Sequence, residues 1–78
     1  MEFLVNLNMV KSVKEFVAIA EKQDFDILIK NQGRAIVIDA KSIMGVFSLD
    51  LSNPINLNIH NEDNLDTILE VLKPYIVE

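Results

Sequence analysis

Few side chains in this 78-residue chain could take part in covalent chemistry. Cysteine is absent and His60 is the sole histidine, which excludes a thiolate zinc site, a cysteine nucleophile and a multi-histidine metal cluster. Asp24, Asp26 and Asp39 are too scattered to suggest a metal site. No glycine-rich phosphate loop and no catalytic triad can be assembled from these residues. We therefore expect a protein that is not an enzyme and that needs no metal and no cofactor.

One hydroxyl group lies where local structure and chemistry could coincide. Ser42 precedes the apolar residues of a short predicted helix, and a serine in that position usually serves as the N-cap. A phosphate on an N-cap serine would lie at the positive end of the helix dipole, so this modification would cost the fold little. The pattern alone fits both a structural cap and a modified residue.

The remaining charged and titratable residues have simple structural interpretations. Lys11 and Lys14 lie around the start of the first predicted helix, where anions can bind, so they are candidates for weak anion binding. Ordinary solvated lysines are the simpler interpretation. His60 fits a surface position near the end of a strand. The acidic residues at the start of the last predicted helix complement its dipole: Glu62, Asp63 and Asp66.

The charge balance argues against several classes of partner. Seven Lys and Arg residues oppose twelve Asp and Glu residues, which gives a formal net charge of −5. Binding to a nucleic-acid backbone requires a basic surface, so we expect no direct nucleic-acid contact. No apolar run is long enough to span a bilayer, and the N-terminus lacks the features of a signal peptide. These observations predict a cytoplasmic protein without a membrane partner.

Alternation of apolar residues predicts four strands, over Glu2–Leu7, Phe25–Lys30, Ala35–Ile38 and Ile55–His60. The turn at residues 31–33 ends in Gly33, which can adopt a positive φ, and it should join the second and third strands as a β-hairpin. In the last strand the polar alternates Asn56, Asn58 and His60 favour a face exposed to solvent.

Helical periodicity predicts three helices. A capping-box sequence at residues 12–15 should begin the first helix, which ends near Gln23. A helix of about two turns follows Ser42, and a two-turn helix cannot bury all of its apolar residues. We expect Val46 and Leu49 in its core-facing half. The last helix begins its apolar stripe at Leu65, runs on to Ile76 and should end or kink at Pro74.

The element order β-α-β-β-α-β-α predicts an α+β fold. Each predicted strand and helix carries its apolar residues on one side. A four-stranded antiparallel sheet should therefore carry all three helices on one face and leave the other face open. This architecture is an open-faced β-sandwich. The length leaves room for one core, so residues 1–78 should form a single domain.

The segment Ala40–Leu49, AKSIMGVFSL, is similar to the start of the second helix in the HPr phosphocarrier family, and the element order also fits along the whole chain. In that family this serine is phosphorylated by the HPr kinase of many Gram-positive bacteria. The resemblance implies an HPr-like protein of the sugar phosphotransferase system, with Ser42 as the regulatory phosphorylation site. It also implies an exposed partner-binding patch formed by Ile43, Met44 and Phe47.

The phosphohistidine motif of the family, Asn-Gly-Leu-His-x-Arg-Pro, is not matched. Counting back from Phe16 places Met9 at the histidine, Lys11 at the arginine and Ser12 at the proline. A gapless count from Ser42 places Lys11 at the histidine instead. Neither count finds a histidine, and neither a thioether nor a protonated amine relays a phosphoryl group.

The resemblance therefore implies a regulatory relative that cannot relay phosphate through histidine. Its partners would be proteins: an HPr kinase and a transcription regulator of carbon catabolite control. Two alternatives stay open. One is a phosphocarrier that has lost its function, and the other is a degenerate HPr-like interaction domain whose serine is never modified. The sequence carries no indication of the oligomeric state.

Overall fold

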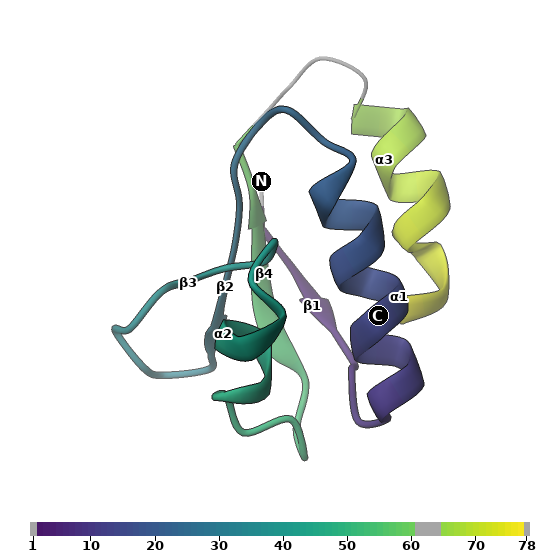
Figure 1. The fold of residues 1–78 in the computed structure, drawn as a ribbon. Helices are drawn as coiled ribbons and strands as arrows, with labels where there is room; N and C mark the ends of the chain where they lie inside the picture. Colours follow the sequence, from purple (N-terminus) through teal and green to yellow (C-terminus); the bar gives the residue numbers. More distant parts are fainter. Residues whose placement is uncertain (1, 61–64, 78) are drawn as a thin grey trace.

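The computed structural model describes residues 2–60 and 65–77 of the chain (Figure 1). Strands and helices alternate along it in the following order: β1 (Glu2–Val5), α1 (Val10–Glu21), β2 (Ile27–Asn31), β3 (Ile38–Asp39), α2 (Ile43–Phe47), β4 (Ile55–Ile59), α3 (Leu65–Leu72), a 3₁₀ turn η1 (Lys73–Tyr75) and β5 (Ile76–Val77). The predicted order is confirmed, with one additional strand at the C-terminal end.

The strands form one antiparallel sheet in the order β3-β2-β4-β1-β5. Strand β4 lies in the middle, and its pairing register places Leu57 opposite Phe3 of β1 and Ile29 of β2. Its apolar residues are buried while Asn56 and Asn58 are half-buried, so the predicted division of the sheet into two faces holds.

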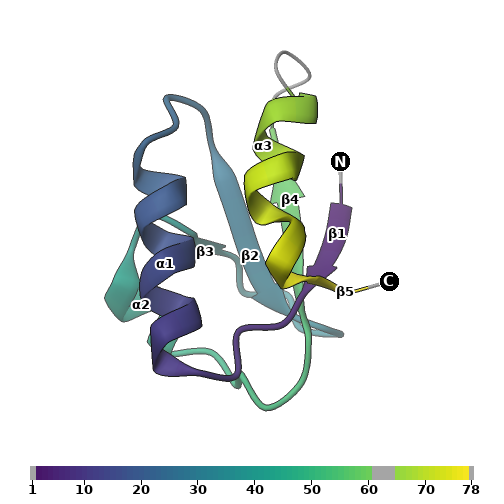
Figure 2. The same cartoon turned by 90° about the vertical axis from the view of Figure 1, so that its right-hand side faces the viewer.

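The helices occupy one side of the sheet. Figures 1 and 2 show α1 and α3 next to each other over the same face, with α2 beside α1. Within the described residues no helix covers the opposite face, so the expected open-faced α+β architecture is confirmed. The core between the layers is apolar throughout and consists of Val5, Leu7, Val13, Phe16, Val17, Ala20, Ile27, Ile29, Ala40, Val46, Ile55, Leu57, Ile59, Ile68 and Leu72.

The fifth strand, β5, corrects the prediction of four strands. Helix α3 ends at Leu72, because Pro74 lacks an N–H group and its ring is incompatible with a continuing helix. The chain then turns through η1, where the carbonyl of Tyr75 accepts a hydrogen bond from the Asn6 N–H at 2.8 Å. Ile76, predicted on the last helical stripe, instead pairs with Val5 at the edge of β1. This pairing satisfies backbone groups that an edge strand leaves open.

The third strand is shorter than predicted. Only Ile38–Asp39 pairs with β2, whereas residues 35–37 leave the ladder and Ile36 is 73% exposed. The turn itself forms as expected, with the Arg34 N–H bonded to the Asn31 carbonyl and Gly33 at φ 75°. Strand preference of β-branched residues reflects packing against neighbours. Because Ile36 is mostly exposed, it gains little of the packing that favours a β-branched residue in a strand.

The start of α1 also differs from the predicted capping box. The helix begins at Val10 with Met9 as its N-cap, and no side chain caps it. Ser12 and Glu15 therefore lie inside the first turns, where the reciprocal capping bonds cannot form. The Val13 N–H already bonds to the Met9 carbonyl at 3.0 Å. Glu62 and Asp63, which were predicted to complement the dipole of the last helix, lie outside the described residues.

Candidate functional site

Ser42 is the N-cap of α2, as the sequence predicts. Its backbone is extended at φ −98° and ψ 106°, and its Oγ accepts a hydrogen bond from the Gly45 N–H at 3.2 Å. Its carbonyl accepts the first helical bond, from the Val46 N–H at 2.9 Å. The residue is nevertheless exposed. Its hydroxyl group thus caps the helix, and the residue lies at the surface.

The turn that leads into Ser42 is held by hydrogen bonds on both sides. The Ser42 N–H bonds to the Asp39 carbonyl at 3.0 Å, and the Lys41 N–H bonds to Asp39 Oδ1 at 2.9 Å. Ala40 is fully buried and its N–H bonds to the Ile27 carbonyl at 2.9 Å. These contacts fix the position of Ser42 relative to the sheet.

Gly45 explains how α2 can lie so close to β3. A Cβ atom on Gly45 would be 2.7 Å from Ile38 Cγ2 and 3.2 Å from Ser42 Oγ. A glycine inside a helix costs about 1 kcal/mol relative to alanine. The close approach is the structural reason for a glycine at this position, which helix propensity alone does not explain.

An apolar surface lies next to Ser42. Ile43, Met44 and Phe47 are 36%, 79% and 41% exposed, and we call these three residues the α2 patch. Val46 is fully buried and Leu49 packs partly against the core, as expected from the sequence. The five-residue helix thus turns one side inward and leaves three large apolar side chains accessible.

The start of α1 adds two exposed apolar residues that the sequence pattern did not single out as surface. Met9 and Val10 are both exposed. Helix α2 lies beside α1 (Figures 1 and 2). The exposure of Met9 and Val10 could have been predicted from the sequence, because both residues precede the buried stripe that starts at Val13 and do not belong to it.

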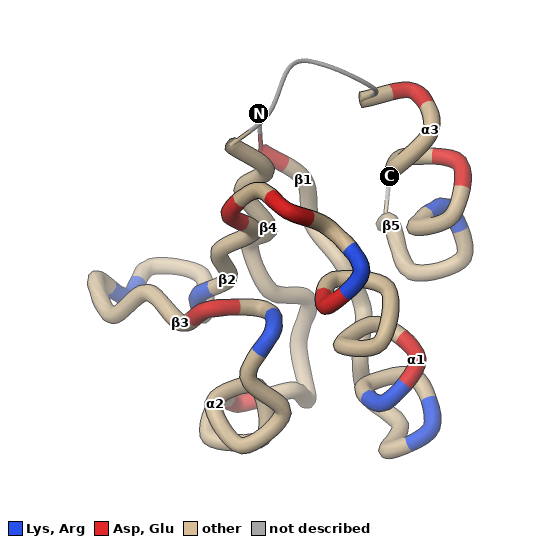
Figure 3. Tube along the Cα trace, turned by 45° about the horizontal axis from the view of Figure 1, so that its top comes forward, with Lys and Arg blue, Asp and Glu red and all other residues tan. Residues whose placement is uncertain are grey.

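Lys11 and Lys14 are exposed on the first turns of α1 and contribute the blue segments at its start in Figure 3. The first turn of α1 contains no acidic residue. Two lysines near the positive end of a helix raise the local positive potential there. Their candidacy for weak anion binding stays a prediction.

His60 lies away from this region. It follows β4, is exposed, and its backbone N–H bonds to the Asp26 carbonyl at 3.1 Å. Strand β4 ends at the top of Figure 1, whereas α1 begins at the bottom. The structure therefore does not bring the histidine to Met9 or Lys11, which occupy the start of α1.

The described part of the chain holds neither a metal cluster nor a membrane-spanning helix. Among residues 2–60 and 65–77, no group of three or more His, Cys, Asp and Glu side chains is arranged to hold a metal ion. In the same residues, none of the helices has the length and apolar character needed to cross a membrane.

Comparison with known proteins gives matches at the level of structure. No protein-family model and no curated protein matches the sequence. The crystal structure of HPr-C-His from Thermoanaerobacter tengcongensis superposes with a TM-score of 0.74 at 23% identity, covering 95% of this chain and 88% of that one. The phosphocarrier protein HPr from Bacillus anthracis str. Ames superposes with a TM-score of 0.71 at 27% identity, covering 99% and 94%. The resemblance inferred from AKSIMGVFSL is thereby confirmed, and the chain is similar in structure to HPr phosphocarrier proteins over nearly its whole length.

Proposed function

We propose that this HPr-like protein is regulatory, is not itself an enzyme, and acts by binding other proteins. Ser42 is the proposed switch, controlled by a kinase, and the α2 patch is the proposed contact surface. The observation that carries this proposal is that Ser42, the N-cap of α2, is exposed and that the same short helix carries three exposed apolar side chains.

The surroundings of Ser42 are compatible with a phosphate. Phosphorylation adds about −1.5 to −2 charges and three strong hydrogen-bond acceptors. The Gly45 N–H that now bonds Ser42 Oγ would face those acceptors. The exposed carboxylate of Asp39, three residues earlier, opposes the added charge. Because α2 has only five residues and its dipole is small, these two effects should nearly cancel, and the switch would change binding without remodelling the domain.

A partner of this surface should combine an apolar contact with basic side chains. The α2 patch provides the apolar contact, and a phosphate on Ser42 would provide charge for arginine in the partner. Lys11 and Lys14 are the proposed weak anion contacts at the start of α1. By resemblance to the family, the proposed partners are an HPr kinase and a transcription regulator of carbon catabolite control, with no direct contact to nucleic acid.

We also infer that the protein does not relay phosphate through histidine. Met9 or Lys11 stands where the family has its histidine, and the sole histidine is exposed at the end of β4. Incubation with enzyme I and phosphoenolpyruvate should therefore leave the protein unlabelled. Label that disappears in His60→Ala would show that His60 accepts phosphate, and label that persists would reveal another acceptor. Either result would overturn this inference.

The switch is tested by incubation with an HPr kinase and ATP, followed by mass spectrometry. The wild type should gain one phosphate and Ser42→Ala none. Ser48→Ala is the matched control, since Ser48 is an exposed serine at the other end of α2, where its hydroxyl donates to the Gly45 carbonyl. This control should be modified like the wild type. An unmodified wild type, or equal labelling of Ser42→Ala, contradicts the proposal.

The alternative function is a degenerate interaction domain without phosphorylation. It is favoured by the N-cap bond from Gly45, because that bond accounts for a serine at position 42 without any kinase. The two functions differ in one measurable respect. The alternative predicts partner binding that depends on the α2 patch and is the same for wild type and Ser42→Asp.

A further inference from the structure

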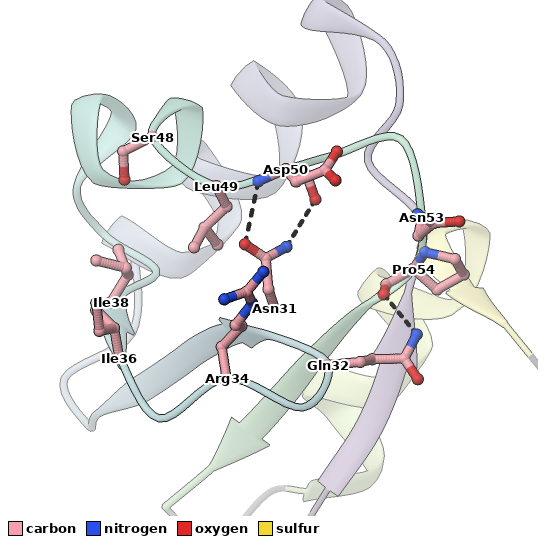
Figure 4. Close-up of a pocket in the computed structure, with 10 residues that line it drawn as sticks. All are labelled: Asn31, Gln32, Arg34, Ile36, Ile38, Ser48, Leu49, Asp50, Asn53 and Pro54. Carbon is pink, nitrogen blue, oxygen red and sulfur yellow. Dashed lines mark hydrogen bonds between the residues drawn. The ribbon is translucent and has the colours of Figure 1, made fainter.

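A cavity of about 730 Å³ lies between the turn that follows β2 and the chain that follows α2 (Figure 4). Small-molecule sites in proteins commonly have volumes of about 300–1,000 Å³. Ser48 and Leu49 line this cavity, whereas Ser42 and the α2 patch do not. The cavity is therefore separate from the proposed binding surface, and a ligand bound in it would be additional to the proposed function.

The two walls of the cavity are tied together by side chains. Asn31 Nδ2 donates to the Asp50 carbonyl at 2.7 Å, and the Asp50 N–H donates to Asn31 Oδ1 at 3.1 Å. Gln32 Nε2 donates to the Pro54 carbonyl at 2.7 Å. The dashed lines in Figure 4 show these bonds bridging the two segments. A cavity held open in this way loses little freedom when a ligand binds, which favours affinity.

Arg34 supplies the only positive charge among the lining residues. Figure 4 shows its side chain projecting between the two segments, near Asn31 and Leu49. Within the described residues its guanidinium group has no hydrogen-bond or ion-pair partner. A guanidinium group offers donors in a fork that matches a carboxylate with two parallel hydrogen bonds.

Asp50 does not neutralise Arg34. Its Oδ1 accepts hydrogen bonds from Ser52 Oγ at 2.6 Å and from the Ser52 N–H at 3.1 Å. These bonds lower the pKa of the Asp50 carboxyl below its ordinary value, so the group stays ionised at neutral pH. In Figure 4 the carboxylate points away from the Arg34 side chain.

The remaining wall beside Arg34 is apolar and is formed by Ile36, Ile38 and Leu49. Ile36 is the most exposed of the three and lies in the segment that leaves the β2–β3 ladder. A branched aliphatic group placed against these side chains would remove apolar surface from water on both partners. A cation next to an apolar wall defines a ligand with an anionic end and an aliphatic body.

We propose that this cavity binds a small monocarboxylate with a branched aliphatic body, whose carboxylate is bound by Arg34. A dianion such as a phosphate monoester fits less well. Arg34 can balance one negative charge only, while Asp50 is ionised nearby and the chain carries a net charge of −5. The second charge of a dianion would be unpaired and repelled.

The probe for this site is 4-methylpentanoate, with neutral 4-methylpentanamide as its isostere. Amide ¹H–¹⁵N NMR titration of the wild type should give saturable shifts centred on residues 34–38 and 48–53. The amide probe should bind at least tenfold more weakly. Arg34→Gln should weaken 4-methylpentanoate binding at least tenfold, whereas Lys22→Gln, which removes an exposed charge at the end of α1, should leave it unchanged.

The same spectra report whether each variant is folded, since Arg34 is exposed and its replacement should leave the peak dispersion intact. The absence of saturable shifts would overturn the proposal. Equal binding of the acid and the amide would overturn it too, as would equal loss in Arg34→Gln and Lys22→Gln. Disodium phosphate in a parallel titration should produce no shifts at these residues, and tighter binding of phosphate than of 4-methylpentanoate would contradict the assigned ligand class.

Discussion

Replacing Gly45 by alanine tests whether a close helix–strand contact holds α2 in position. An added Cβ would lie 2.7 Å from Ile38 Cγ2, well inside the ordinary contact distance of about 3.5–4 Å. Ile38 is half-buried and β-branched, so its methyl group cannot move away freely. Overpacking of this kind costs about 1–3 kcal/mol.

Helix propensity acts in the opposite direction. Alanine is favoured over glycine in a helix interior by about 1 kcal/mol. The sum predicts that Gly45→Ala lowers the free energy of unfolding by about 1 kcal/mol, with a range of about 0–2 kcal/mol. In an Ile38→Ala background the contact with Ile38 Cγ2 is absent and only the 3.2 Å contact with Ser42 Oγ remains, so Gly45→Ala should instead stabilise the domain by up to about 1 kcal/mol.

Urea denaturation of the four proteins, followed by circular dichroism, measures this coupling. The double-mutant cycle should give an interaction energy of about 1–3 kcal/mol. Gly33→Ala is the matched control, because a Cβ there meets no atom within 4 Å but the backbone has φ 75°. It should cost about 1–2 kcal/mol in both backgrounds. If Gly45→Ala has the same effect with and without the Ile38 side chain, the close contact does not constrain α2.

Four further predictions concern the surface, the core and the C-terminal turn. Ser42→Asp keeps an N-cap acceptor for the Gly45 N–H, so its free energy of unfolding should stay within about 0.5 kcal/mol of wild type in the same denaturation assay. Met44→Ser, at an exposed position, should likewise change stability by less than about 0.5 kcal/mol while weakening partner binding in a pull-down. Val46→Ala, at a fully buried position, should by contrast cost roughly 2 kcal/mol. Burial, and next the charge of Glu15, raise the pKa of the Tyr75 hydroxyl, so the folded state holds this proton more tightly than the unfolded chain does. The stability that this provides is present below about pH 10 and is lost as the pH rises through the folded-state pKa, and Tyr75→Phe should remove that dependence from denaturation curves recorded between neutral and alkaline pH.

The main layers of the fold could be predicted because they depend on local periodicity. Val13, Phe16 and Val17 repeat at helical spacing and are buried, and Ile55, Leu57 and Ile59 alternate and are buried. A strand or helix with apolar residues on one side is buried on that side. This information is contained in each segment alone, so it is available before any tertiary contact is known.

Element boundaries depended on contacts that are distant in sequence. Ile76 joined the sheet because β1 offered an unpaired edge and because Pro74 ended the helix. Ile36 lies outside the paired part of β3 and is 73% exposed. Both residues are β-branched and apolar, so their local preferences are the same, and their tertiary neighbours determine the different outcomes.

The cavity beside Arg34 could not be predicted from the sequence either, because residues that are distant in sequence form it. The Asn31–Asp50 bonds join residues 19 positions apart, and the Gln32–Pro54 bond joins residues 22 positions apart. Asparagine, glutamine and aspartate in such segments are typical of loops, and no spacing rule relates them. The Ser42 N-cap could be predicted because its partner, Gly45, lies three residues away on the same helix.

Packing explains the identity of some residues in the AKSIMGVFSL segment and leaves that of others unexplained. Ala40 and Val46 are fully buried, and Gly45 is required by the approach of Ile38. A stable α2 needs these three and a capping side chain at position 42. It does not need Met44 to be large and apolar, because that side chain is 79% exposed, and burying it would be favourable only against another molecule. The fold therefore accounts for the first group, and the exposed side chains of the α2 patch are the part of the segment that calls for a binding partner.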